Sequence, residues 1–433
     1  MRVLVYVRKE PLLTFYQNLA GKVSDNDFYS VSEFKNTGDF WLGKFLYRDN
    51  EKIIFEEKEA RDIYYRCRFL RKYSFEFSYG IINKMAAGIQ EIIHDIKPQI
   101  ILAPVIDNYT LDIIERLSKI NQIPYISICG HFFSGYSRIT ARGEYNYYPR
   151  VVSKEEVEKI SNLLLEKTYI PQFHENLKIS LKDKYILYAR GLIKKYFYFQ
   201  LAKRIQGDYY NYHYNTYFEG ANIKDINKYL TNIDKFFTEV DDIDYSERNV
   251  YMPLHVTPEA TVDYWCDDAM YGMEYTKSIL NIVENSTKDA TFIIKEHPAM
   301  YMLRNKDFYE SLLAYQNVKL IHPLENSNLV LQKTNITFTE NGSVGVESLL
   351  RNKLVICNSS NYYDKFHPNV HRRVIVNDED MKISLEDYDN KLFIKDILQG
   401  NIKGRLFNNV NILNSDTNTL FEQIRFYANY KTK

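Results

Sequence analysis

The amino-acid sequence predicts an α/β protein of two lobes, each built on a mainly parallel sheet. Two stretches, 99–129 and 249–357, alternate apolar strand patterns with amphipathic helix patterns, which is typical of βαβ units. Their strands are short and almost continuously apolar, as expected where helices cover both faces of a sheet. The chain has 433 residues, enough for two to three domains of ordinary size.

In the first lobe, an alternating apolar run at 2–7 predicts the first strand. The next elements form one βαβ unit: strand 99–105 (QIILAPV), helix 108–120 and strand 124–129 (PYISIC). Ligand-binding groups are expected at the carboxyl ends of such strands. Ser153 and Glu156 form a capping box, which predicts a further helix at 153–166.

A helical connector rich in tyrosine is expected between the lobes. It comprises a long helical pattern at 181–206, a Tyr- and Asn-rich loop at 207–220 and a helix at 224–240. The basic and aromatic residues at 190–204 allow two interpretations. Their aromatic rings pack inward, or they lie on an anionic membrane surface.

The second lobe repeats the alternation of strands and helices, and helical stretches from Leu385 onward are expected to cross back to the first lobe. Strands are predicted at 249–254, 291–295, 318–321, 335–339 and 354–357, with helices at 268–285, 307–315 and 343–351. The predicted domains are 1–175 (first lobe), 176–245 (connector), 246–380 (second lobe) and 381–433 (C-terminal helices).

Composition excludes several classes of protein. The chain has 56 Lys and Arg against 56 Asp and Glu, a balance that argues against a dedicated nucleic-acid binder. No apolar run of about 18 residues could span a bilayer. The four cysteines form no CxxC pair, which excludes a zinc ribbon or a disulfide scaffold and fits a reducing compartment. We therefore expect a cytoplasmic protein.

The strongest candidate site is the sequence TENGSVGVESLL at 339–350, between a strand and a helix. Gly342 and Gly345 allow a tight turn, and the first amides of the helix with the Ser343 hydroxyl could bind an anion. Glu347 lies one turn further on the same face and could accept hydrogen bonds from a ribose. The turn therefore supplies four candidate nucleotide-binding residues: Asn341, Gly342, Ser343 and Glu347. The alternative is an ordinary glycine-rich turn with Glu347 in solvent.

Two further motifs follow strands of the second lobe. In KEHP, His297 stands where an open α/β sheet binds ligands, and Lys295 adds positive charge. The alternative is that His297 caps a neighbouring loop. In PLHVTPEAT, His255 and Glu259 are expected to face a cleft between the two predicted lobes. The alternative is that this stretch is only a hinge made rigid by proline.

The first lobe offers candidates for the catalytic base. Asp107 follows the strand QIILAPV, although an acid at a helix start is also common for dipole reasons alone. His131 stands at the end of the next strand and could act as a base or contact the acceptor. Arg138 could hold an anionic substrate. Since no cluster of ligands has metal-binding spacing, we expect neither a metal nor another cofactor.

PLHVTPEAT, KEHP and TENGSVGVESLL, in this order and at strand ends, resemble the bacterial capsule polysaccharide synthesis family over residues 249–360. That family includes Kdo transferases that prime capsule chains, and it shares an HP-type motif with bacterial polysialyltransferases. The resemblance implies a GT-B fold of two Rossmann-like lobes. It also implies transfer of a sugar from a nucleotide-activated donor, often CMP-linked, to a surface or capsular polysaccharide.

By position, the resemblance implies that His297 contacts the donor phosphate or nucleotide, and that Gly342, Ser343 and Glu347 hold its phosphate and ribose. His255 and Glu259 match a PLHxxPE element without an assigned role. Where many members have an acidic residue, this sequence has Cys129-Gly130-His131, so the catalytic residue stays open.

The leading hypothesis is thus a metal-independent glycosyltransferase. Its partners would be a nucleotide-sugar donor and a glycan or glycolipid acceptor, with peripheral contact to the inner face of the cell membrane. One alternative is a sugar-nucleotide 2-epimerase, which shares the two lobes and needs no polymer acceptor. Another is a non-catalytic subunit for polysaccharide assembly or export.

Overall fold

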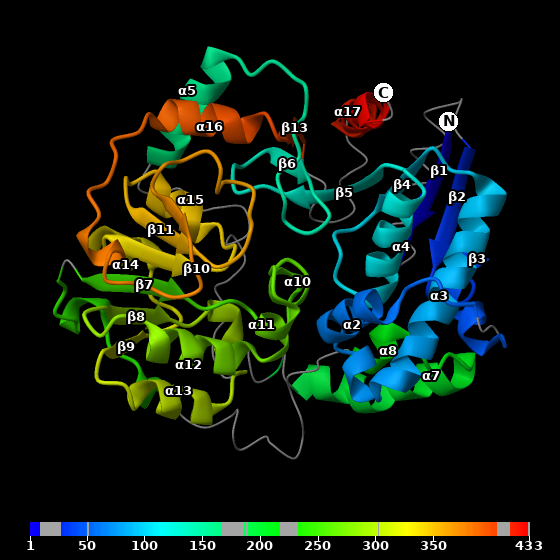
Figure 1. Ribbon diagram of the computed structural model, residues 1–433, viewed down its shortest axis with the longest axis horizontal. Coiled ribbons are helices and arrows are strands. Elements are labelled where there is room, and N and C mark those ends of the chain that lie inside the picture. Colours follow the sequence, from blue (N-terminus) through cyan, green and yellow to red (C-terminus); the bar gives the residue numbers. More distant parts are fainter. Residues whose placement is uncertain are drawn as a thin grey trace. The chain divides into compact units, whose positions relative to one another are not determined.

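The computed structural model describes residues 1–8, 27–49, 52–165, 186, 189–216, 233–246, 248–301, 303–404 and 416–431. The chain divides into two compact units (Figure 1). The first comprises Met1–Val152, Ile193–Tyr217 and Leu398–Lys433, and the second Ser153–Leu192 and Phe218–Ile397. Each contains a mainly parallel sheet with helices, which confirms the predicted fold class. The boundaries of the four predicted domains stay a prediction.

The first unit has a seven-stranded sheet in the order β13-β6-β5-β4-β1-β2-β3. Strands β1 to β5 are parallel to one another, while β6 pairs antiparallel with both β5 and β13. The strands are β1 Arg2–Tyr6, β2 Asp27–Ser32, β3 Phe40–Trp41, β4 Ile100–Ala103, β5 Tyr125–Gly130, β6 Tyr136–Ile139 and β13 Asn401–Lys403. The chain order reverses between β1 and β4, which creates a crevice at their carboxyl ends.

The helices of the first unit begin and end with recognisable caps. Asn108 accepts a hydrogen bond from the Leu111 amide (2.9 Å) and starts α4, as its sequence predicts. Ser74 caps α3 in the same way. The elements are η1 Leu42–Tyr47, α2 Glu57–Arg66, η2 Leu70–Lys72, α3 Phe75–Ile96, α4 Tyr109–Ile120, the π-helix η3 Lys194–Phe199, α7 Gln200–Gln206, α8 Tyr212–Thr216 and α17 Asp416–Lys431.

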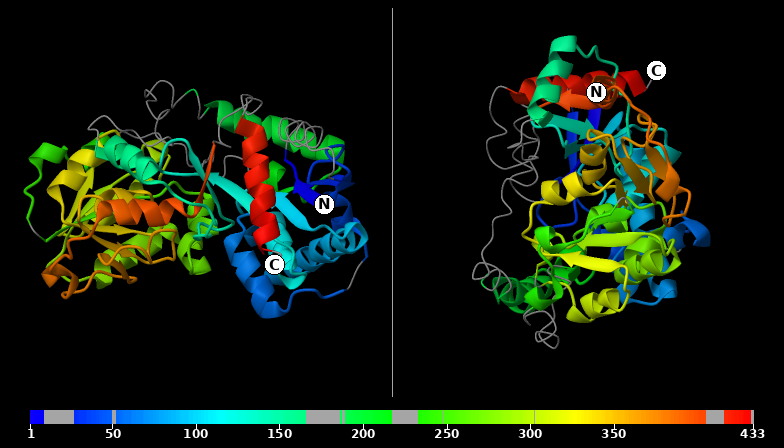
Figure 2. Two further views of the ribbon diagram at one scale, coloured as in Figure 1. Left: turned by 90° about the horizontal axis from the view of Figure 1, so that it is seen from above. Right: turned by 90° about the vertical axis from the view of Figure 1, so that its left-hand side faces the viewer.

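The C-terminal helix belongs to the core of the first unit. Figure 2 shows α17 lying against this unit. Its Ile424, Tyr427 and Ala428 are buried in one cluster with Val3 and Val5 of β1. The C-terminal chain therefore returns to the N-terminal sheet.

The second unit has a six-stranded parallel sheet in the order β12-β11-β10-β7-β8-β9. Its strands are β7 Asn249–Pro253, β8 Thr291–Lys295, β9 Val318–Ile321, β10 Ile336–Thr339, β11 Leu354–Cys357 and β12 Val370–Arg372. In chain order this is 3-2-1-4-5-6 read from the β9 edge, the Rossmann arrangement, with its switch point between β7 and β10.

Helices and short turns connect these strands. They are α5 Lys154–Leu165, η5 Asp234–Phe236, η6 Val240–Asp242, α10 Ala260–Asp263, α11 Ala269–Met273, α12 Tyr275–Asn285, η7 Pro298–Met300, α13 Lys306–Leu313, α14 Ser327–Lys333, α15 Val344–Leu349, η8 Asp380–Lys382 and α16 Asn390–Leu398. Apolar side chains of the strands and helices fill one core, which includes Val250, Ile279, Phe292 and Phe338.

Three predicted elements differ from the structure. The helix expected at 268–285 is two helices, α11 and α12. The loop expected at 207–220 contains α8, because the Asn211 side chain accepts hydrogen bonds from two amides of its first turn. The helix expected at 224–240 lies partly outside the described residues. From 233 on it is wrong, because Thr238 pairs with the edge strand β9 instead.

Among the described residues, no helix has the length and apolar composition needed to cross a membrane. All four cysteines are free thiols.

Candidate functional site

An ion pair occupies the switch point of the second unit. His255 follows β7 and Glu340 follows β10, and the parallel order of the sheet brings these two strand ends together. The His255 Nε2 lies 2.8 Å from the Glu340 Oε2. The Tyr271 hydroxyl donates to the other oxygen of the same carboxylate. The pair therefore joins two motifs that lie far apart in the sequence.

The electrostatics of this pair favour its charged form. Burial lowers the pKa of His255, but the Glu340 carboxylate together with Glu259 outweighs burial, so the net direction is upward. Burial likewise raises the pKa of Glu340, but the His255 imidazole together with the Tyr271 hydroxyl outweighs it, so the net direction is downward. Glu340 is 1% exposed and the His255 side chain 12%. A cationic imidazole thus reaches the surface of the crevice, while its counter-ion stays inside.

A buried arginine fixes the loop that carries His255. Arg304 donates to both oxygens of Glu296, to the Thr257 hydroxyl (2.9 Å) and to the His255 carbonyl (2.8 Å). Tyr309 donates to the same Glu296 carboxylate. Because Glu296 directly follows β8 and is also bound by Tyr309 of α13, Arg304 ties the loop of His255 to both elements.

The glycine-rich turn lies directly beside His255. An added Cβ at Gly342 would stand 3.5 Å from the His255 ring and 3.0 Å from the Thr339 hydroxyl. The Asn341 amide donates to the Thr261 carbonyl (2.8 Å). Its Oδ1 is buried and has no hydrogen-bond partner within the described part of the chain. The turn thus contains a buried acceptor atom without a partner among the described residues.

The turn needs its glycines for space and not for an unusual backbone conformation, since neither Gly342 nor Gly345 has a positive φ. The Tyr363 hydroxyl donates to the Gly342 carbonyl (3.1 Å). A Cβ at Gly345 would overlap that hydroxyl. The helix that follows, α15, is only six residues long. The Gly345 amide in its first turn bonds back to the Gly342 carbonyl (3.1 Å), so part of the expected anion site is already satisfied.

Glu347 lies half-buried on α15, four residues after Ser343 as predicted. Burial raises the pKa of its carboxyl to about 7, and the Arg351 guanidinium opposes the rise. The side chain can therefore change its protonation state near neutral pH.

The KEHP residues lie further from the turn. Lys295 is buried and donates to the Pro323 carbonyl (2.9 Å), in the loop after β9 and on the far side of β8 from the glycines. Burial lowers its pKa to about 8. The His297 Nδ1 accepts the Ala299 amide (3.1 Å), which is the alternative role of loop cap. Glu259 is exposed, and its carboxylate accepts a hydrogen bond from the Thr261 hydroxyl. The structure thus brings His255 to the glycine-rich turn, but not Lys295.

In the first unit, Asp107 stands at the switch point between β1 and β4. Its carboxylate is bound by two nitrogens of Arg8, one of them at 2.6 Å. Near it, Glu33 after β2 is 4% exposed and accepts hydrogen bonds from Tyr6 and Thr110. The His213 Nε2 lies 3.1 Å from the same carboxylate. The predicted base is therefore one member of a polar cluster at this edge.

His131 and Arg138 both lie inside the first unit. The His131 Nδ1 accepts the Phe133 amide (2.9 Å). Burial, aided by the Arg138 charge, lowers the pKa of His131 well below its usual value. Arg138, 8% exposed on β6, donates to the Gly143 carbonyl (3.1 Å). A neutral, buried imidazole in this position holds the turn after β5.

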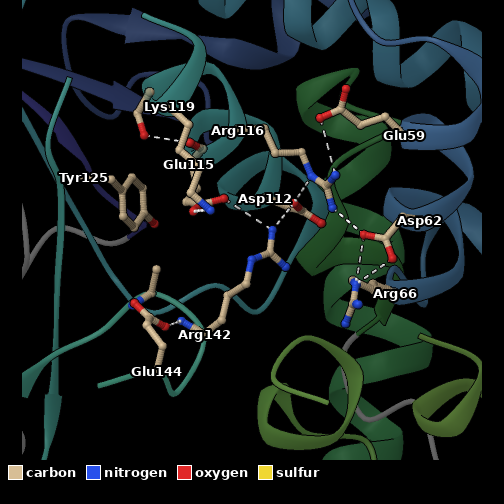
Figure 3. Close-up of polar contacts among 12 residues, drawn as sticks. Glu59, Asp62, Arg66, Asp112, Glu115, Arg116, Lys119, Tyr125, Arg142 and Glu144 are labelled. Atoms are coloured by element: carbon tan, nitrogen blue, oxygen red, sulfur yellow. Dashed lines mark hydrogen bonds and ion pairs between the residues drawn. The ribbon is translucent and has the colours of Figure 1, made fainter. Parts of the chain in front are cut away.

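A network of ion pairs joins α2, α4 and the loop after β6 (Figure 3). Arg116 contacts Asp112 at 2.6 Å and also Asp62, and Arg142 binds the same Asp112 carboxylate. Burial raises the pKa of Asp112, but Arg142 and Arg116 lower it by more, to about 2. A cavity of about 340 Å³ opens beside the network. Its acidic and basic groups compensate one another, so it has no evident preference for an anion.

Sequence reasoning missed the residues that complete the site. Glu340 was within the quoted motif, directly after a strand, and that position was its signal. Glu296, directly after β8 in KEHP, had the same signal, whereas Tyr271 and Arg304 carried none, because their importance comes from contacts with residues outside the quoted motifs. Among the described residues, no group of three metal-ligating side chains comes together.

Residues 156–366 match the family model described as capsule polysaccharide biosynthesis protein. The resemblance to this family is confirmed. The matched region contains the His255–Glu340 pair and all three motifs on which the resemblance rests. Among curated proteins, none matches the chain.

Solved structures show distant likeness. A UDP-GlcNAc 2-epimerase from Methanocaldococcus jannaschii is 13% identical, with 99% of this chain and 100% of that chain covered and a TM-score of 0.25. KpsC from Thermosulfurimonas dismutans, a beta Kdo 2,7 transferase, is 11% identical, with 80% and 87% covered and a TM-score of 0.34. Likenesses this weak carry no information about substrate or mechanism.

Proposed function

We propose that this protein is a glycosyltransferase of capsule polysaccharide biosynthesis, and that it uses a nucleotide-sugar donor, with a CMP-linked sugar favoured. One observation carries the proposal: a buried carboxylate holds a cationic imidazole at the switch point of a Rossmann-type sheet, beside a glycine-rich turn. This is where such sheets bind nucleotides. The preference for CMP rests on the resemblance of the motifs alone.

The proposed chemistry follows from charge. When the glycosidic bond to the nucleotide breaks, negative charge grows on the phosphate oxygen of the leaving group. The His255 imidazolium, kept charged by Glu340, can donate a hydrogen bond to that oxygen. Asn341 and Glu347 then offer acceptors for ribose hydroxyls or base amino groups. In this proposal, Gly342 and Ser343 line the phosphate, and His297 contacts the nucleotide.

A cavity lies next to the proposed donor site in the second unit, although neither His255 nor the glycine-rich turn lines it. A cavity of about 580 Å³ is lined in part by Tyr271 of α11 and by Asn358 and Ser359, which follow β11. Its volume is within the range of small-molecule sites. Tyr271 also binds Glu340, so the cavity and the ion pair share a residue.

The acceptor hydroxyl needs a proton acceptor, and we propose that the first unit supplies it. Asp107 remains the candidate predicted from the sequence, although Arg8 holds its carboxylate. The His213–Glu33 pair adds a second candidate, since His213 is 22% exposed while its carboxylate partner is buried. His131 is the weaker candidate, because it is buried and its Nδ1 accepts a backbone amide.

Nucleotide titration by calorimetry tests the donor site. CMP, CDP, UDP and GDP are titrated into the wild-type protein, the His255→Gln variant and a control, Lys319→Gln, on the exposed side of β9. Loss of the charged hydrogen bond at His255 should weaken binding by about ten- to a hundredfold. The control should bind as the wild type does. Equal affinity of the His255→Gln variant would place the donor elsewhere.

Incubation with nucleotide sugars separates the alternatives. A transferase moves the sugar to an acceptor glycan, or slowly to water, and releases the nucleotide. Isomerisation of the nucleotide sugar without acceptor would identify an epimerase. Failure of every nucleotide to bind would favour the non-catalytic subunit.

A further inference from the structure

The helical segment 193–206 presents an unusual surface on the first unit. Its exposed apolar side chains recur at every fourth residue: Ile193 is 60% exposed, Phe197 72%, Leu201 59% and Ile205 74%. Beside them, Tyr198 is 65% exposed. One interpretation of this segment was that its aromatic rings pack inward, and for the exposed rings of Phe197 and Tyr198 that interpretation is wrong. Solvent exposure of so much contiguous apolar surface normally marks an interaction site.

The charge of the same segment has one sign. Residues 193–206 contain Lys194, Lys195, Lys203 and Arg204 and no Asp or Glu. In a protein whose total charges balance, this concentration of cations is local. A helix with a bulky apolar stripe and flanking cations is suited to the interface of an anionic bilayer, where the stripe enters the acyl boundary and the cations meet phosphate groups.

Neighbouring aromatic residues extend this surface. The segment ends at Gly207, whose carbonyl accepts a hydrogen bond from the Tyr47 hydroxyl (3.1 Å). Tyr47, Phe77 and Tyr209 are each nearly half exposed, and the Tyr47 and Phe77 rings both contact Tyr210. Tyrosine is favoured at a membrane interface because its ring is apolar and its hydroxyl remains hydrated.

We propose that residues 193–206, together with Tyr47, Phe77 and Tyr209, bind the surface of an anionic lipid bilayer. Attraction between lipid phosphates and Lys194, Lys195 and Arg204 brings the segment to the membrane, and insertion of the apolar stripe holds it there. Lys203 is half-buried and donates to the Asn215 side chain (2.9 Å). The proposal does not depend on the sugar-transfer reaction.

Vesicle flotation of the full-length protein tests the proposal. The vesicles contain phosphatidylcholine alone or phosphatidylcholine mixed with phosphatidylglycerol. We expect binding to the anionic vesicles, weak binding to the neutral ones, and release by high salt, because salt screens the attraction. No binding to anionic vesicles, or equal binding to both kinds, would overturn the proposal.

Paired substitutions locate the surface. Leu201→Gln with Ile205→Gln removes two apolar side chains and should weaken binding by about tenfold or more. Lys194→Gln with Arg204→Gln should weaken it and reduce its salt dependence. The control, Ile53→Gln with Val151→Gln, changes two equally exposed apolar residues elsewhere on the unit and should bind like the wild type.

Because all these residues are exposed, thermal unfolding of each variant should match the wild type. Unchanged vesicle binding by the Leu201/Ile205 variant would refute the assignment. Size-exclusion chromatography adds a further outcome. A dimer that this variant dissociates, without vesicle binding by the wild type, would assign the surface to a second copy of the chain and contradict the proposal.

Discussion

At the scale of single residues, Glu347 is a candidate site residue whose protonation state changes near neutral pH. Burial raises the pKa of this carboxyl to about 7. Since the folded state holds the proton more tightly than the unfolded state, the contribution of Glu347 to stability falls as pH rises from about 4.5 to about 7. In the folded state the carboxyl ionises only as pH passes through about 7, so the gain in nucleotide affinity should come after most of this stability has been lost.

The first prediction compares wild type with Glu347→Gln. The ratio of their nucleotide affinities should be close to one near pH 6 and rise to roughly ten near pH 8, since the lost bond is charge-assisted only when the carboxyl is ionised. Calorimetric titration over this pH range measures it. Using the ratio cancels the titration of His255, which is the same in both proteins. A ratio independent of pH would show that Glu347 does not contact the nucleotide.

At the scale of elements, the two units use glycine for different reasons. In the turn before α15, Gly345 leaves room for the Tyr363 hydroxyl, which binds the Gly342 carbonyl and so holds the loop at the candidate site. In the middle of α3, Gly80 is exposed and has no atom within 4 Å of an added Cβ. The same substitution should therefore have opposite effects at the two positions.

The second prediction is that Gly345→Ala lowers the free energy of unfolding by about 1–3 kcal/mol, because the added methyl overlaps Tyr363. Gly80→Ala should raise it by about 0.5–1 kcal/mol, because alanine loses less backbone entropy in a helix. Urea denaturation of both variants measures the two changes. Stabilisation by both substitutions would show that the turn tolerates a side chain and that Tyr363 is not fixed there.

At the scale of the whole molecule, both sheets reverse their chain order beside the first strand, and both place charged pairs at that point. Arg8 with Asp107 lies at the reversal in the first unit, and His255 with Glu340 in the second. In each case arginine or histidine supplies the positive charge. Each of these cations is compensated by its carboxylate partner, but it can still donate a hydrogen bond to a phosphate.

The third prediction concerns metals. Nucleotide binding and sugar transfer should both persist in excess EDTA, because the proposed site stabilises the leaving group by a hydrogen bond from His255 and not by a divalent cation. Parallel assays with EDTA, and with EDTA followed by excess magnesium or manganese, measure it. Activity that is lost in EDTA and restored by either metal would contradict the proposed role of His255.

Local sequence patterns predicted most strands of the two sheets and the positions of the three motifs, but not the strands β2, β3, β6, β12 and β13. Apolar runs such as QIILAPV and TFIIK must be buried, and their spacing leaves room for one helix between strands, so βαβ units follow from local patterns. The Asn108 cap and the glycine-rich turn are local as well. These signals lie within a few residues of one another, which is why they can be recognised without a structure.

Only the tertiary structure decided which polar residues meet and which surfaces stay exposed. Glu340 pairs with His255 because β10 lies beside β7, and Arg304 reaches both Glu296 and the His255 loop from a distant segment. His131 and Lys295 carried the same local signals but are bound within the fold. The stripe from Ile193 to Ile205 is exposed although its sequence equally permits burial. Strand order and the packing of distant segments determine these outcomes, and no short-range pattern encodes them.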